Sequence, residues 1–255
     1  MIPIGDDNRD RRTTPFITWA LIAVNVFVFA YFQGFGTNER FTYAYATVPA
    51  EILSGKDIVT PDRVFMDRST GHRVLVPGLQ PTPVPVFLTI FISMFMHAGL
   101  AHILGNMLYL LIFGDNVEDR LGHFRYLLFY LFCGAVASLA QVYTTLFTGG
   151  ALNVPSLGAS GAISGVLGAY LLLFPRKRVR VLMGVFIVPV PAIFAVGIWF
   201  MFQVVNGLGY LGGGGQTGGV AYAAHIGGFI AGFATVKIWE IGRRAPRTRA
   251  WRERP

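Results

Sequence analysis

Apolar stretches close to the length of a membrane-spanning helix are the feature that most restricts how this chain can fold. A helix needs about 20 residues to cross a hydrocarbon layer that is about 30 Å thick. Several runs in the sequence come close to that length, and 53% of the 255 residues are hydrophobic while 13% are charged. A single water-soluble globule cannot bury so much apolar surface, so the composition predicts one compact integral membrane domain.

Six apolar segments predict an all-α polytopic bundle of six transmembrane helices. A polar stretch that ends near residue 84 predicts a long first external loop between the first and second spans. Pro189 and Pro191 interrupt a further apolar segment at 179–190, which we expect to lie at the membrane interface and lead into the fifth span, with a seven-span count as the alternative. The expected spans are residues 16–35, 97–114, 124–147, 160–174, 191–208 and 220–241.

The basic residues of the connecting segments predict how these spans are oriented. They precede span one and follow spans two and four, and the C-terminal tail is also basic, whereas connections 148–159 and 209–219 carry no charge. The positive-inside rule therefore predicts a cytoplasmic N-terminal segment (1–14), a membrane domain (15–242) and a cytoplasmic tail (243–255). Because the net charge of +8 is confined to these flanks, we expect the lipid bilayer as a partner and no nucleic acid.

Polar residues gather in the outer half of three expected spans. Span two begins with His97, His102 and Asn106, span four begins with Ser160, and span six carries His225 about two turns below its outer end. Polar side chains within a bilayer are costly unless they form a functional site. This convergence predicts a site made from distant parts of the sequence, in which we assign His97 a structural role.

The residue types and their spacing indicate what that site does. His102 and Asn106 stand four residues apart on one helical face, where both side chains can donate to the same oxygen. Ser160 opens span four, where unpaired backbone N–H groups favour a developing negative charge. A lone serine usually serves helix packing, and His225 alone could be a satisfied core histidine, but their matched depth predicts a nucleophile and its general base.

Small residues provide the close helix approach that such a pair needs. Gly161 lies on span four, and Ala224, Gly228 and Gly232 on span six follow a small-xxx-small pattern. The outer halves of spans two, four and six hold no acidic residue, so the chain lacks the groups of a membrane aspartyl protease or metalloprotease. A Ser-His dyad remains, with Glu51 or Asp57 of the first loop open as an orienting carboxylate, and we expect no metal or cofactor.

Three motifs together closely resemble the rhomboid intramembrane proteases of bacterial type. The resemblance covers about residues 15–242, and the three motifs occur in the family's order on three expected spans. They read His97-x4-His102-x3-Asn106, Gly158-Ala159-Ser160-Gly161 and Ala224-His225-x2-Gly228-x3-Gly232.

The resemblance implies a serine endopeptidase that works without a cofactor on transmembrane or juxtamembrane segments of membrane proteins. Ser160 would attack a peptide carbonyl, and His225 would remove its proton and return it to the leaving amine. His102, Asn106 and the Ser160 backbone N–H would stabilise the oxyanion. The chain departs from the family at Ser164, where some members place a tyrosine beneath the histidine ring, so the support of that ring is left open.

Two other functions are weighed against this one. Retention of Ser160 and His225 argues against an inactive rhomboid-like protein that binds membrane clients. The lack of an inverted repeat argues against a small transporter. The small size favours the plasma membrane of a bacterium over an organelle. The glycines of 212–215 are typical of a flexible connector, and their place above His225 also fits a mobile lid.

Overall fold

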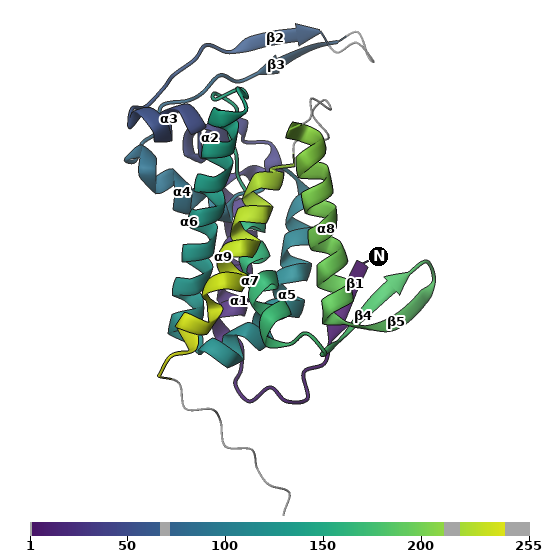
Figure 1. Ribbon diagram of the computed structural model, residues 1–255. Coiled ribbons are helices and arrows are strands. Elements are labelled where there is room, and N and C mark those ends of the chain that lie inside the picture. The colour runs from purple at the N-terminus through teal and green to yellow at the C-terminus, as the bar shows by residue number, and fades with distance from the viewer. Residues whose placement is uncertain (1, 67–71, 212–219, 243–255) are drawn as a thin grey trace, which may run out of the picture.

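Helices form the body of the molecule, and two small antiparallel sheets lie at its periphery (Figure 1). The computed structural model describes residues 2–66, 72–211 and 220–242. The expected tail at 243–255 and the expected lid at 212–215 lie outside the described residues.

The long apolar segments fold as helices, as their composition predicts. Three helices in the described part of the chain are long and apolar enough to cross a membrane, namely Leu100–Leu121, His123–Phe147 and Ala192–Gly209. The bundle consists of α1 (Phe16–Phe27) continued by a π-helix (Val28–Phe32), α5 (Leu100–Leu121), α6 (His123–Phe147), α7 (Ser160–Leu173), α8 (Ala192–Leu211) and α9 (Tyr222–Glu240).

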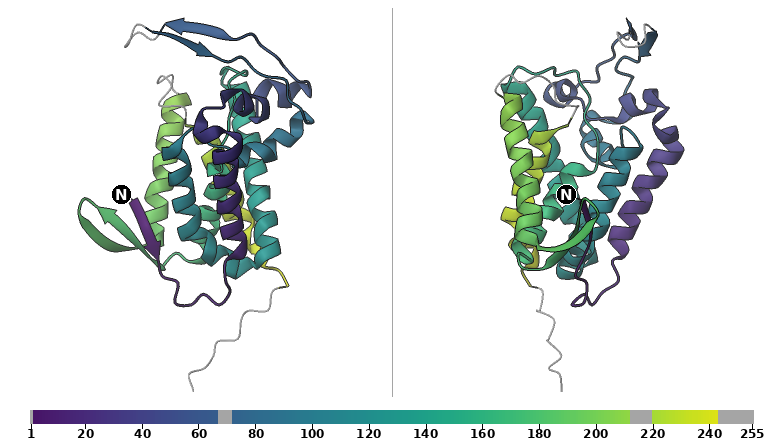
Figure 2. Two further views of the ribbon diagram at one scale, coloured as in Figure 1. Left: turned by 180° about the vertical axis from the view of Figure 1, so that it is seen from behind. Right: turned by 90° about the vertical axis from the view of Figure 1, so that its right-hand side faces the viewer.

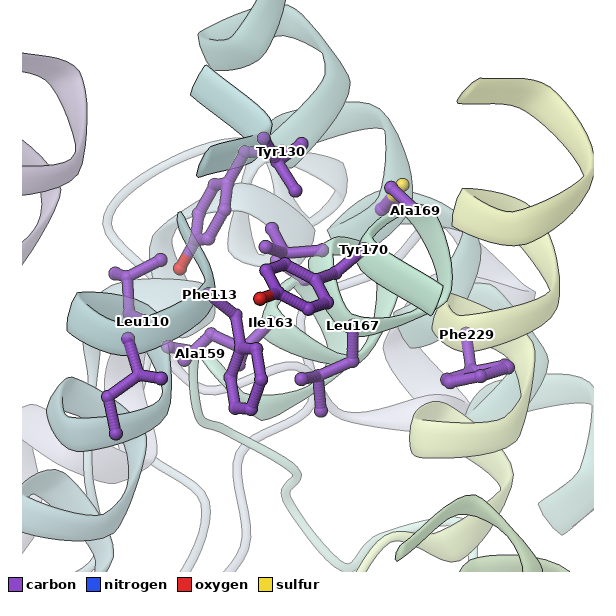
Figure 3. Close-up of a cluster of buried hydrophobic side chains, with 14 of the residues drawn as sticks. Leu110, Phe113, Tyr130, Ala159, Ile163, Leu167, Ala169, Tyr170 and Phe229 are labelled. Atoms are coloured by element: carbon purple, nitrogen blue, oxygen red, sulfur yellow. The ribbon is translucent and has the colours of Figure 1, made fainter. Parts of the chain in front are cut away.

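Helix α7 lies at the centre of the bundle, with α5, α6, α8 and α9 around it (Figures 1 and 2). All residues from Gly161 to Tyr170 are buried, because this helix is apolar on every side. The close-up in Figure 3 shows Leu167 and Tyr170 of α7 among the aromatic rings of neighbouring helices. Tyr170 meets Phe113 of α5 edge-on, with ring centroids 4.9 Å apart.

Glycines bring α7 and α9 into backbone contact. A Cβ atom placed on Gly228 would overlap the carbonyl oxygen of Gly161, and one placed on Gly232 would overlap that of Gly165. No larger residue fits at either α9 position without moving the helices apart. The start of α7 is therefore held directly against the start of α9.

A three-stranded sheet corrects the all-α prediction. β1 (Ile2–Asp6) pairs with β4 (Arg178–Met183), and β4 pairs with β5 (Phe186–Pro191), in both cases antiparallel. Segment 179–190, expected as an interfacial lead-in, thus forms most of a hairpin. Arginine and valine alternate along β4 with the period of a strand, and Gly184 supplies the positive φ of +63° at the turn.

The stretch between α1 and α5 is also more structured than a polar loop. It contains α2 (Glu39–Tyr45), α3 (Pro49–Ser54), the hairpin of β2 (Arg63–Met66) and β3 (Arg73–Val76), the 3₁₀ turns Gly34–Gly36, Val86–Leu88 and Ser93–Phe95, and α4 (Thr89–Ile92). Helix α5 begins at Leu100, because the backbone of Gly99 is fully extended. His97, which we expected at the start of span two, therefore precedes the helix.

Candidate active site

A cavity of about 1120 Å³ opens between the beginnings of α5, α7 and α9 and the end of α8. His102, Asn106, Ser160 and His225, all singled out from the sequence, line this cavity. His97 does not. The structure thus brings together polar residues from three expected spans.

Ser160 and His225 lie within hydrogen-bonding distance of each other. The Ser160 Oγ atom is 2.8 Å from His225 Nε2. Ser160 is the first residue of α7, and His225 lies in the first turn of α9. The sequence placed His225 about two turns below the outer end of its span, which was too deep because α9 begins only at Tyr222.

Gln203 of α8 is a member of the site that the sequence reasoning missed. Its side chain is buried, with 5% exposure, and its Oε1 atom lies 2.8 Å from His225 Nδ1. A buried glutamine in the apolar segment 191–208 was a signal of its own, because polar side chains in such segments need a partner. The sequence did not indicate which residue Gln203 meets.

The contacts of Gln203 favour one position for the proton on His225. Its Nε2 group donates to the carbonyl of Trp199 at 3.4 Å, which turns Oε1 towards His225. Because Oε1 can only accept, Nδ1 of His225 must be the donor. Nε2 is then left as an acceptor for the hydroxyl proton of Ser160, which is the arrangement that a general base requires.

Two aromatic residues pack beside the His225 ring. The Trp199 ring lies 6.1 Å from it at 36°, and the Tyr222 ring lies 6.5 Å from it at 84°. Ser164 donates to the carbonyl of Ser160 at 2.6 Å. Helix α8 and the start of α9 therefore supply aromatic rings beside the imidazole.

His102 and Asn106 offer donors to the same cavity. His102 Nδ1 accepts from the Ala98 N–H at 3.4 Å, so its Nε2 carries the proton. Gly158, at φ +126°, brings the backbone before Ser160 against this ring, because a Cβ atom there would lie 3.0 Å from His102 Nε2. The buried Nδ2 of Asn106 has no hydrogen-bond partner among the described residues. Both side chains can thus donate to an oxygen atom beside Ser160.

His97 is fixed through its backbone. Gln33 accepts from the His97 N–H at 2.8 Å and donates to the His97 carbonyl at 3.0 Å. The buried ring of His97 lies 5.1 Å from the His102 ring, and neither nitrogen of the His97 ring bonds to another described residue. The ring lies against that of His102, and the structural role assigned to His97 stays a prediction.

The acidic residues left open by the sequence lie elsewhere. Glu51 accepts from the Ile58 N–H at 3.2 Å, and Asp57 accepts from the Thr82 N–H at 3.1 Å. Neither meets His225, whose Nδ1 is bound by Gln203. Across the described ranges, no three His, Cys, Asp or Glu side chains are grouped so that they could hold a metal ion.

Comparisons with known proteins point to one family. The model of the Rhomboid domain matches residues 85–239. "Rhomboid protein 1, mitochondrial" of Saccharomyces cerevisiae is 32% identical over 171 residues, which cover 67% of this chain and 46% of that protein. "Rhomboid protease GluP" of Bacillus subtilis is 36% identical over 140 residues, which cover 54% of this chain and 23% of that protein. The human "Presenilin-associated rhomboid-like protein, mitochondrial" is 28% identical over 199 residues, covering 70% and 48%. The chain thus spans less than half the length of each of these relatives.

Proposed function

The chain belongs to the rhomboid family of intramembrane serine proteases, and from this membership we propose that it is itself an active serine endopeptidase of the membrane. The observation that carries the proposal is the 2.8 Å approach of Ser160 Oγ to His225 Nε2, with Nδ1 of the same ring bound by Gln203. An inactive client-binding protein has no need of this arrangement.

In the proposed reaction, Ser160 attacks a peptide carbonyl while His225 Nε2 takes the hydroxyl proton. The resulting imidazolium is stabilised by Gln203 Oε1, which accepts from Nδ1–H. His225 then returns the proton to the leaving amine, and an acyl-enzyme remains for water to hydrolyse. His102, Asn106 and the Ser160 backbone N–H donate to the oxyanion.

The expected substrates are membrane proteins with transmembrane or juxtamembrane segments. A cavity of about 1120 Å³ has room for several residues of unwound chain, and its walls are largely apolar. An extended segment can reach Ser160 only after leaving its helix, because an intact helix buries its own carbonyl groups in hydrogen bonds.

We propose six membrane spans, formed by α1, α5, α6, α7, α8 and α9, with both termini on the basic side and the domain boundaries at 15 and 242. Three of these helices are long and apolar enough by themselves, and the central α7, with 14 residues, is enclosed by others. The cytoplasm is the expected basic side. Mitochondrial proteins are prominent among the relatives, so these do not favour a bacterial plasma membrane.

Cleavage of a model transmembrane substrate by the purified protein tests the proposal. Ser160→Ala and His225→Ala should each reduce cleavage to background, a loss of at least about 10³-fold. Ser164→Ala is the matched control, since this serine is also on α7 but bonds only to a backbone carbonyl. A fluorophosphonate probe should label the wild type and not Ser160→Ala. Cleavage that survives either dyad substitution contradicts the assignment.

A further inference from the structure

The sheet of β1, β4 and β5 exposes a large apolar end. In Figures 1 and 2 it projects from the side of the bundle, along the half of α8 that lies nearer the basic connections. Four side chains at its turn and at the free end of β1 are more than half exposed: Val185 (86%), Phe186 (71%), Ile187 (58%) and Ile2 (53%). Such a contiguous apolar surface indicates contact with a lipid or a protein.

The opposite end of the same sheet is basic. Arg178 and Arg180 are exposed on β4, and Arg176 is exposed just before it. The alternate residues Val179 and Val181 are buried against the helices, so the arginines of β4 face outwards. None of the three arginines forms an ion pair within the described part of the chain.

β4 carries the chain from its arginines towards the depth of one lipid leaflet, and it runs obliquely to the helices (Figures 1 and 2). From Arg178 to Met183 the strand extends about 17 Å at about 3.3 Å per residue. Half of a hydrocarbon core of about 30 Å is about 15 Å. If the arginines lie at the level of lipid phosphates, the turn at Gly184 lies among acyl chains.

The free edge of β5 is adapted to an apolar environment. The Ala192 N–H donates to the Lys177 carbonyl at 2.9 Å and so points towards β4. N–H groups alternate in direction along a strand. Even-numbered β5 residues therefore point their N–H groups towards β4, and odd-numbered residues point theirs away from it. Pro189 and Pro191 occupy two of these positions and have no N–H group. Within β5 only Ile187 presents an outward donor, which suits lipid and disfavours pairing with another strand.

We propose that this sheet is a lipid-binding element of the basic-side leaflet. Its apolar turn inserts among the acyl chains, and Arg176, Arg178 and Arg180 bind the phosphate groups of anionic lipids. The inference rests on the proposed function, because it requires that the helices span a bilayer and that these arginines lie at the face of the bilayer where the basic connections are.

The position of the sheet gives this binding a consequence for the site. β5 ends at Pro191, and α8, which carries Gln203, begins at the next residue. A second cavity of about 310 Å³ lies between α5 and α8, and Pro3 of β1 and Val181 of β4 are among its lining residues. A lipid-bound sheet therefore braces α8 where α8 and α5 are separated.

The charge part of the proposal is tested with detergent-purified protein and added phosphatidylglycerol or phosphatidylcholine, with bound lipid counted by native mass spectrometry. The Arg178→Gln/Arg180→Gln variant should bind phosphatidylglycerol about 10- to 30-fold more weakly. The matched control is Arg63→Gln/Arg73→Gln in the β2–β3 hairpin, which should bind like the wild type. Equal binding by all three proteins overturns the proposal, and displacement of the lipid by inorganic phosphate alone overturns lipid as the ligand.

The depth part is tested with a bimane label on Val185→Cys in vesicles, since the native Cys133 is buried. Nitroxides on the acyl chains should quench this label, and aqueous iodide should not. A second label on Leu128→Cys, on an exposed position of α6, reports whether the helices are in the bilayer. Quenching by lipid at Leu128 but by iodide at Val185 contradicts the inference alone. Quenching by iodide at both positions contradicts the proposed function as well.

Discussion

The two ends of helix α5 use polar residues in opposite ways. At its beginning, Asn106 keeps a buried amide donor without a partner in the described structure. About 18 Å further along, at 1.5 Å per residue, Glu118 is fully engaged. Its carboxylate accepts from the backbone N–H groups of Ile17 and Thr18 at 2.9 and 2.7 Å and from the Thr18 hydroxyl at 2.7 Å, and His123 Nδ1 lies 2.5 Å away.

The difference teaches how one helix serves both chemistry and stability. Saturated hydrogen bonds at the basic end fix α1 and α6 against α5, because breaking them leaves buried groups unsatisfied. Unused donors at the other end cost stability but are available to a charge that develops during a reaction. Substitutions at the first end should therefore lower stability, and substitutions at the second should lower activity.

The largest expected effect in this comparison is on activity, at Asn106. Asn106→Ala should reduce kcat by about 10²- to 10³-fold, because one oxyanion donor is lost. The melting temperature should hardly change, since the amide group has no partner to lose. Asn116→Ala on the same helix is the control. It should lower the melting temperature, because it removes the hydrogen bond that Asn116 donates to Asp6 at 2.7 Å. Equal melting-point losses in both variants would remove the contrast between the two ends.

Glu118→Gln should show the reverse behaviour. The neutral amide cannot accept from all of the donors that face Glu118, so unfolding should become easier by about 3 kcal/mol. The folded fraction should cleave substrate at nearly the wild-type rate. Chemical denaturation in detergent, with cleavage measured on the remaining folded protein, separates the two quantities. A selective loss of kcat without a loss of stability would break the comparison.

Gln203→Leu sharpens the comparison at the site itself. Loss of one neutral hydrogen bond to His225 Nδ1 should lower the rate of fluorophosphonate labelling of Ser160 about tenfold. Gln203→Glu keeps the acceptor and should restore labelling. The matched control is Asn206→Leu on the same helix, because its amide bonds only to the Phe202 carbonyl at 2.7 Å. Identical labelling by the two leucine variants would show that Gln203 does not position the histidine.

The smallest effect concerns Asp6 of β1, at the basic end. Burial raises the pKa of this carboxyl to about 6, helped by Asp115 and Asp7 and opposed by Tyr170 and Lys177. Because the folded protein disfavours the ionised form, stability should fall as pH rises from about 4 to 6. Asp6→Asn should abolish this loss, which we expect to be about 1 kcal/mol after solvent screening.

Melting curves of wild type and Asp6→Asn across that pH range measure the effect. Asp7→Asn is the control. Hydrogen bonds from Arg9 lower the pKa of Asp7, so this carboxylate contributes stability that is lost as pH falls, the opposite direction to Asp6. A pH slope that persists in Asp6→Asn would assign the titration to another group.

Much of the helical framework follows from the sequence, because hydrophobicity and length are local properties. The segments at 124–147, 160–174 and 191–208 lie within two or three residues of the helices observed there. The hairpin of β4 and β5 was missed for a related reason. Two prolines exclude a helix but do not reveal that β1, some 170 residues earlier, supplies a strand for β4 to pair with.

By itself, the sequence determined which side chains had to be explained, since a serine, histidines and an asparagine in apolar segments are costly without a purpose. Only the tertiary structure decided how they meet. The partner of His225 is Gln203 on α8, and the carbonyl of Trp199 orients the amide of Gln203. The depth of His225 depends on where α9 begins. Such contacts join helices that are distant in sequence. The glycine pattern indicates that α7 and α9 approach closely, but the pattern along one helix does not reveal which side chain of α8 meets His225.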